Sequence, residues 1–99
     1  MKKIVITHPT LGIYIGTNIY RYHFWTKRDR LDIDAVVAFD TIEQAQNHAK
    51  LNHEAFPENI EFKSVEADCG DGKFASIAAC IKAGLDGWLE SISAVGSMQ

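Results

Sequence analysis

The sequence predicts an α+β fold: a small antiparallel sheet of three to five strands with two helices packed on one face, in the order β-β-β-α-β-α. Short segments rich in β-branched and aromatic residues occupy most of residues 1–40. Two later segments repeat apolar residues at helical spacing, and turn-forming Gly, Pro and Asp separate the elements. Residues 1–99 are too few for two cores, so we expect a single domain.

The first half of the chain reads as strands. Residues 3–8 predict the first strand, and residues 13–15 begin a second that a bulge or tight turn interrupts at 16–18. Residues 19–26 are dense in aromatic side chains and predict a third. The charged residues 27–34 are expected to form a mobile connector, and residues 35–39 a central apolar strand.

Asp40 or Thr41 is expected to cap the first helix, because both are followed by an acid or amide at the capping-box spacing. Its apolar face would contain Ile42, Ala45 and Ala49, and it should end before Pro57. Residues 60–65 predict another strand, and residues 68–72 a turn.

Residues 74–85 have the clearest helical period of the chain and predict a second helix, with Gly84 as its C-terminal cap. Cys80 falls on the apolar side of that helix and is expected in the core. A short closing helix at 88–92 would place Trp88 in the core, and the tail 94–99 is expected to be flexible.

Charge is distributed unevenly along the chain. Six of the ten Lys and Arg residues, but one of the thirteen acids, lie in residues 1–30. Within residues 19–26, strand alternation places Ile19, Arg21, His23 and Trp25 on one face, and Tyr20, Tyr22 and Phe24 on the other, which we assign to the core. Trp, Tyr and Arg are enriched in protein-binding hot spots. The predicted contact residues are therefore Arg21, His23, Trp25, Lys27 and Arg28.

These observations favour a non-catalytic protein-binding module, and two alternatives remain open. The aromatic and basic residues 19–30 could hold single-stranded nucleic acid by stacking and phosphate contacts, although the pI of about 5.7 argues against this. Residues 31–99, which carry the other acids, could instead form a surface that resembles nucleic acid and occupies a basic groove of a partner. The simpler alternative is a solvated surface that keeps the protein soluble.

Signatures of enzymes and cofactors are lacking in the sequence. Residues 70–76 depart from the phosphate-loop pattern because Phe74 stands where a hydroxyl residue is required. His48 and His53 are not at the spacing that places two metal ligands on one helix face, and Cys69 and Cys80 do not have zinc-knuckle spacing. We therefore predict no catalytic activity, no cofactor and no metal.

The sequence also suggests a compartment. It lacks an apolar run long enough to span a membrane or to form a signal peptide, and two cysteines do not make a disulfide framework. We expect a cytoplasmic protein without membrane contact. A homodimer and a monomer are equally compatible with a small sheet that has strand edges to protect.

Four segments, THPTLGIYIG (7–16), FW (24–25), FDTIEQA (39–45) and ASIAACIKAGLDGW (75–88), resemble small accessory proteins of bacteriophages and prophages. The resemblance is one of overall pattern and brings no catalytic motif. It implies a host protein as the partner, since such accessory proteins commonly bind host proteins and include inhibitors of defence systems such as CRISPR effectors.

Overall fold

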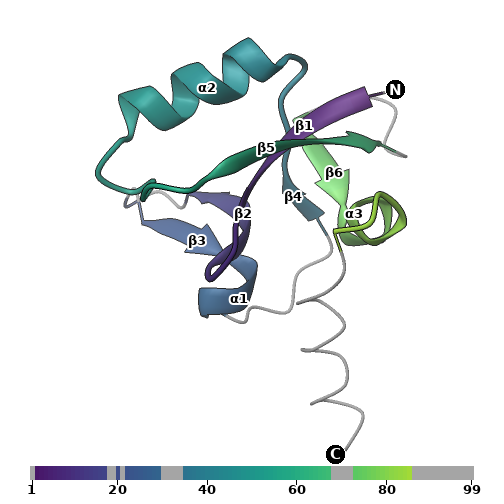
Figure 1. Cartoon of the computed structure of the whole chain (residues 1–99), viewed down its shortest axis with the longest axis horizontal. Helices are drawn as coiled ribbons and strands as arrows, with labels where there is room; N and C mark the ends of the chain where they lie inside the picture. The colour runs from purple at the N-terminus through teal and green to yellow at the C-terminus, as the bar shows by residue number, and fades with distance from the viewer. Residues whose placement is uncertain (1, 18–19, 21, 30–34, 68–72, 86–99) are drawn as a thin grey trace, which may run out of the picture.

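The computed structural model describes residues 2–17, 20, 22–29, 35–67 and 73–85. Within these ranges an antiparallel four-stranded sheet has the order β3-β2-β1-β5, and β4 and β6 form a two-stranded sheet (Figure 1). The strands are β1 (Lys2–His8), β2 (Gly12–Thr17), β3 (His23–Trp25), β4 (Ala35–Val37), β5 (Glu61–Glu66) and β6 (Phe74–Ser76). The helices are α1 (Thr26–Asp29), α2 (Ile42–Leu51) and α3 (Ile77–Lys82). The predicted α+β class is confirmed.

β1 connects the two sheets. It pairs with β5 along residues 2–7, whereas its pairing with β2 is limited to its last two residues. Where β2 departs, Phe39 takes the place beside Ile4, with backbone N···O distances of 2.7 and 2.8 Å in the two directions. The predicted central strand at 35–39 therefore lies at the junction between the sheets and is not central in the larger one.

Two clusters of buried side chains lie on opposite sides of β1. Val5 belongs to one cluster and Ile6 to the other, because neighbouring residues of a strand point to opposite faces. Cys80 of α3, buried as predicted, packs in the Val5 cluster, whereas Ala45 and Ala49 of α2 pack in the Ile6 cluster. The expectation that both helices cover one face is therefore wrong, and the helices lie on opposite sides of β1 (Figure 1).

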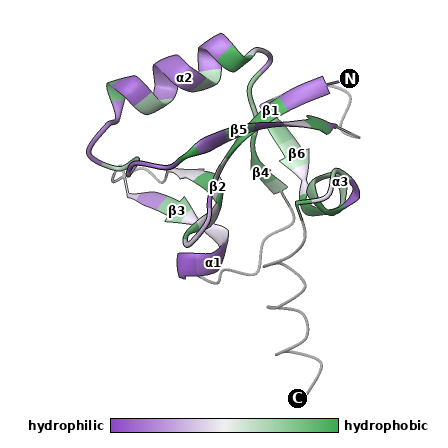
Figure 2. Ribbon diagram, viewed as in Figure 1, coloured by the Kyte–Doolittle hydropathy of each residue, from purple (hydrophilic) through white to green (hydrophobic). Residues whose placement is uncertain are grey.

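The start of α2 agrees with the predicted capping. The Thr41 hydroxyl accepts a hydrogen bond from the Gln44 N–H at 3.1 Å, and the Gln44 side-chain oxygen accepts one from the Asp40 N–H at 3.1 Å. The two alanines named above are buried, but Ile42 is 49% exposed. The apolar face of α2 is thus narrower than predicted, and hydrophilic residues predominate along this helix (Figure 2).

The predicted second helix begins three residues later than expected. Phe74 lies in β6, where it pairs with Val37 of β4, and it is 52% exposed. The Ser76 side chain then accepts the Ala79 N–H at 3.0 Å and caps α3. Strand pairing with β4 therefore decides the conformation of residues 74–76, although their apolar spacing continues the helical pattern.

The end of α3 agrees with the prediction. Gly84 adopts a φ of 87°, and its N–H donates to the Ile81 carbonyl at 3.0 Å. The Leu85 N–H donates to the Cys80 carbonyl at 3.0 Å, which completes a Schellman motif.

The aromatic segment forms a shorter strand than predicted. β3 spans three residues, and the chain then enters α1, where a loop was expected. The predictions for residues 30–34, the turn at 68–72, the closing helix with Trp88, and the tail lie outside the described residues.

None of the helices in the described part of the chain has the length and apolar character that crossing a membrane requires.

Candidate functional site

α1 rests on the turn between β1 and β2. The Thr26 hydroxyl accepts the Ile13 N–H at 2.9 Å, and the Leu11 carbonyl accepts the Lys27 N–H at 2.9 Å. Gly12 lies between these contacts with a φ of 93°, and a Cβ at this position would stand 2.3 Å from the Thr26 hydroxyl oxygen. Glycine is therefore required for the close approach that positions α1.

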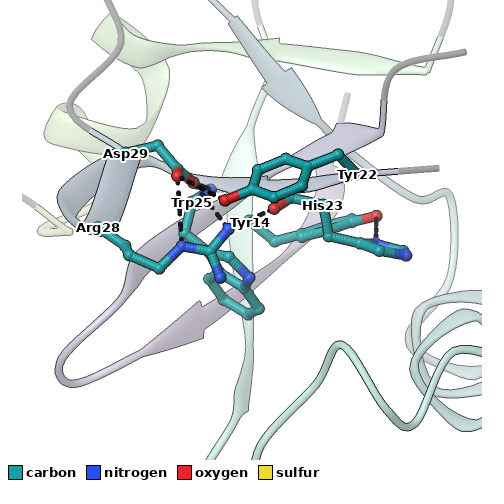
Figure 3. A network of polar contacts seen from close by, with 6 residues as sticks. All are labelled: Tyr14, Tyr22, His23, Trp25, Arg28 and Asp29. Carbon is teal, nitrogen blue, oxygen red and sulfur yellow. Dashed lines mark hydrogen bonds and ion pairs between the residues drawn. The ribbon is translucent and has the colours of Figure 1, made fainter. Parts of the chain in front are cut away.

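Asp29 connects the end of α1 back to β3. Its carboxylate accepts the Trp25 N–H at 2.6 Å and forms an ion pair with Arg28 at 3.0 Å (Figure 3). The Arg28 guanidinium also donates to the His23 carbonyl and lies over the Tyr22 ring, 5.5 Å from its centroid. The positive charge of Arg28 is thus compensated and fixed in place.

The exposure predicted for the aromatic segment is reversed at Tyr20, Tyr22 and Trp25, whereas His23 and Phe24 are both half-buried. Trp25, expected to be exposed, is 0% exposed and packs edge-on against Tyr14 and Phe56 at centroid distances of 5.3 and 5.6 Å. Tyr22, expected in the core, is 50% exposed, and Tyr20 is 82% exposed. The inward face carries Trp25, which has the largest ring of the segment. His23 lies on the same face, and its polar partner removes the free-energy cost of burying the imidazole.

The structure brings part of the predicted contact set together. His23, Trp25 and Arg28 lie close to one another (Figure 3). Trp25 is buried and Arg28 is exposed. Lys27 is half-buried in α1. Arg21 lies outside the described residues.

A hydrogen-bond network centred on Tyr14 joins three elements. The buried Tyr14 hydroxyl, from β2, lies 2.9 Å from Nδ1 of His23 in β3 and 3.1 Å from Nε2 of His48 in α2. The Phe56 ring packs against all three side chains, with centroid distances between 4.6 and 5.8 Å. The network therefore fixes α2 and the segment after it against the sheet.

The electrostatics of this network favour neutral side chains. Burial raises the pKa of Tyr14 to about 12, so its hydroxyl stays protonated. Burial lowers the pKa of His23, and the nearby Arg28 charge lowers it further. Burial likewise lowers the pKa of His48, and the charge of His23 adds to that effect. Both imidazoles are therefore neutral near pH 7.

Two adjoining depressions open beside the network, with volumes of about 490 and 460 Å³. Both are lined by His23, His53, Glu54 and Ala55. Leu51, which is 83% exposed, lines the first, and the second extends over the exposed side chains of Tyr22, which precedes β3, and of Arg28 in α1. We call this region the His23 surface and define it as Tyr22, His23, Arg28, Leu51 and residues 53–57.

Sequence reasoning missed Tyr14, His48 and Phe56 as members of the site. These residues lie on β2, on α2 and after α2, and no local spacing connects them to β3. Among the residues that the structure describes, no group of three or more His, Cys, Asp or Glu side chains is arranged to hold a metal ion.

Comparison with known proteins gives no match: no family model, no curated protein and no solved structure is similar to this chain.

Proposed function

We propose that this chain is a non-catalytic protein-binding module, and that the His23 surface is its contact face. The observation that carries the proposal is the composition of that surface. Tyr22 and Leu51, 50% and 83% exposed, flank hollows that can receive side chains of a partner. Arg28 lies beside them with its charge already compensated by Asp29, so it can enter an interface without an unpaired charge.

Nucleic acid fits this surface less well. Glu54 lines both hollows, and Asp29 pairs with Arg28. These two negative charges oppose the phosphate contacts that dominate nucleic-acid binding. Trp25, the ring expected to stack on a base, is buried. The resemblance to phage and prophage proteins supports a cytoplasmic host protein as the partner, and a component of a defence system such as CRISPR is one such protein.

The test compares two double variants with matched side chains. Tyr22→Ala with Leu51→Ala removes an aromatic and an aliphatic side chain from the His23 surface. Phe74→Ala with Ile81→Ala removes an exposed pair from β6 and α3. The immobilised wild type and both variants are exposed to a bacterial lysate, and a captured protein is purified and titrated against each.

We expect the first pair to weaken the affinity at least tenfold, about 1.4 kcal/mol, and the second pair to leave it unchanged. Equal losses in both pairs, or none in the first, would contradict the assignment. A labelled single-stranded oligonucleotide, titrated at about 50 mM salt, is the second arm. If the oligonucleotide binds, if this binding weakens steeply with salt, and if the first pair of substitutions abolishes it, then the partner is nucleic acid and not a protein.

A further inference from the structure

The Tyr14 hydroxyl has one hydrogen but two imidazole partners. It can donate to one ring nitrogen, so the other ring must donate its own N–H to the hydroxyl oxygen. Two neutral histidines satisfy this requirement, whichever of them is the donor. The three side chains come from β2, β3 and α2. The distribution of protons among them therefore decides whether α2 stays hydrogen-bonded to the sheet through the Tyr14 hydroxyl.

One added proton leaves this arrangement intact. The ring that donates to Tyr14 can be protonated on its far nitrogen and still keep its N–H···O bond. A second proton cannot be accommodated in the same way. Both rings would then direct an N–H at the same oxygen, the hydroxyl hydrogen would lose its acceptor, and two positive charges would share one buried oxygen.

We propose that Tyr14, His23 and His48 form a pH-sensitive latch that tolerates one proton and opens with the second, releasing α2 from β2 and β3. The latch is a property of the fold, and it stands whether or not the His23 surface binds a protein.

The charged groups near His23 do not favour a second positive charge. His23 shares its hollow with Arg28 of α1 and with His53 and Glu54, which follow α2. Burial lowers the pKa of His23, and Arg28, although paired with Asp29, still lowers it further. Glu54 is the one carboxylate among the residues that line this hollow. Tyr22 also lines this hollow.

The charged groups near His48 are balanced in sign, and the acid among them is already engaged. His48 lines a separate hollow of about 630 Å³, together with Asp40, which precedes α2, and Lys73, which precedes β6. Asp40 is paired with Lys3 of β1. Among the described residues, no carboxylate is hydrogen-bonded to either imidazole of the latch. A second positive charge would therefore have no compensating partner.

The direction of the pH effect follows from the lowered pKa values of both histidines, for which burial is the main cause. Unfolded histidines titrate near pH 6.5, so below that pH the unfolded chain binds more protons than the folded one. The stabilisation is therefore complete above about pH 6.5 and is lost as the pH falls through the lower folded-state pKa values.

The first experiment measures the unfolding equilibrium constant in urea at several pH values between about 6.5 and 5, above the range of ordinary carboxylates. Once the folded protein holds one proton on the latch, unfolding takes up one more, so the constant rises up to ~10-fold per pH unit at the acidic end of this range. His48→Gln leaves one histidine, and the folded state tolerates the single proton that this histidine binds, so we expect the rise of the constant to level off there. His53→Gln, a control with an exposed ring, should behave like the wild type. Equal slopes for the wild type and His48→Gln would overturn the latch.

The second experiment needs no variant and decides the question if His48→Gln does not fold. The imidazole NMR signals of the wild-type protein are followed from about pH 8 to 5, together with the backbone amide signals of α2. His23 and His48 should titrate in two separate steps, and the native α2 signals should disappear with the second step. A single shared step, or native α2 signals that persist once both rings are charged, would overturn the latch.

Discussion

The indole of Trp25 contacts two other aromatic rings at edge-to-face distances, 5.3 Å from Tyr14 and 5.6 Å from Phe56. Such pairs add about 0.5–1.5 kcal/mol each beyond the burial of apolar area. Among the described residues, Trp25 is the largest of the fully buried side chains. Its truncation would therefore leave a large cavity beside Tyr14, at the centre of the polar network.

We accordingly expect Trp25→Ala to lower the free energy of unfolding by ~3–5 kcal/mol. Phe24→Ala serves as the control, because Phe24 is the neighbouring ring on the outer face and is half-exposed. Its loss should be clearly smaller. Urea unfolding followed by far-ultraviolet circular dichroism measures both. A Trp25→Ala protein as stable as Phe24→Ala would contradict the burial of the indole.

The site could be predicted from the sequence only in part, and β3 shows the reason. Alternation correctly assigns His23 and Trp25 to one face, but it does not tell which face is buried. Counting apolar rings favoured Tyr22 and Phe24 as the core. The outcome depends on Tyr14, whose hydroxyl provides the half-buried His23 with a partner from another strand. A contact of this kind leaves no local pattern in the sequence.

At the scale of elements, the position of α1 depends on a backbone contact at Gly12. α1 has four residues, too few to be a stable helix by itself, so its position comes from bonds to the β1–β2 turn. Gly12 combines a φ of 93° with a Cβ position that overlaps the Thr26 hydroxyl. Gly84 offers a comparison, because its φ is 87° but a Cβ there would meet nothing within 4 Å.

Substituting each glycine with alanine therefore separates the strain of a positive φ from the steric overlap of the added Cβ with Thr26. Gly84→Ala should cost about 1–2 kcal/mol of stability, the strain of a left-handed backbone with a side chain. Gly12→Ala should cost clearly more, because the added methyl group also breaks the bond between Thr26 and the Ile13 N–H. Thermal unfolding of both variants provides the measurement. Equal losses at the two positions would show that α1 is not held by this close approach.

The elements that sequence analysis predicted well are those specified locally. The Thr41 cap of α2 and the Gly84 cap of α3 both depend on residues within one helical turn. Residues 74–76 were assigned to a helix because Phe74 continues the apolar period of α3. Their strand conformation comes from pairing with β4, nearly forty positions earlier in the chain. Such pairing overrides a local preference that is small per residue.

At the scale of the whole molecule, β1 supplies the structural link between the two halves of the core. Val5 and Ile6 are adjacent and fully buried, yet they pack in different clusters, one with α3 and the other with α2. The bridge between Ile4 and Phe39 joins the two sheets at the same strand. A strand shared in this way should make the two clusters unfold together, as expected of a domain this small.

The last prediction tests that cooperativity with one conservative substitution in each cluster. Ile6→Val reduces the α2-side cluster, and Ile13→Val reduces the α3-side cluster; both side chains are 0% exposed. Each change should cost about 0.5–1.5 kcal/mol. In urea titrations followed by NMR, the native amide signals of Ala45 in α2 and Ala79 in α3 should disappear at one common midpoint, lowered in both variants. If Ile6→Val shifts the Ala45 transition but leaves that of Ala79 in place, the clusters unfold independently and β1 does not couple them.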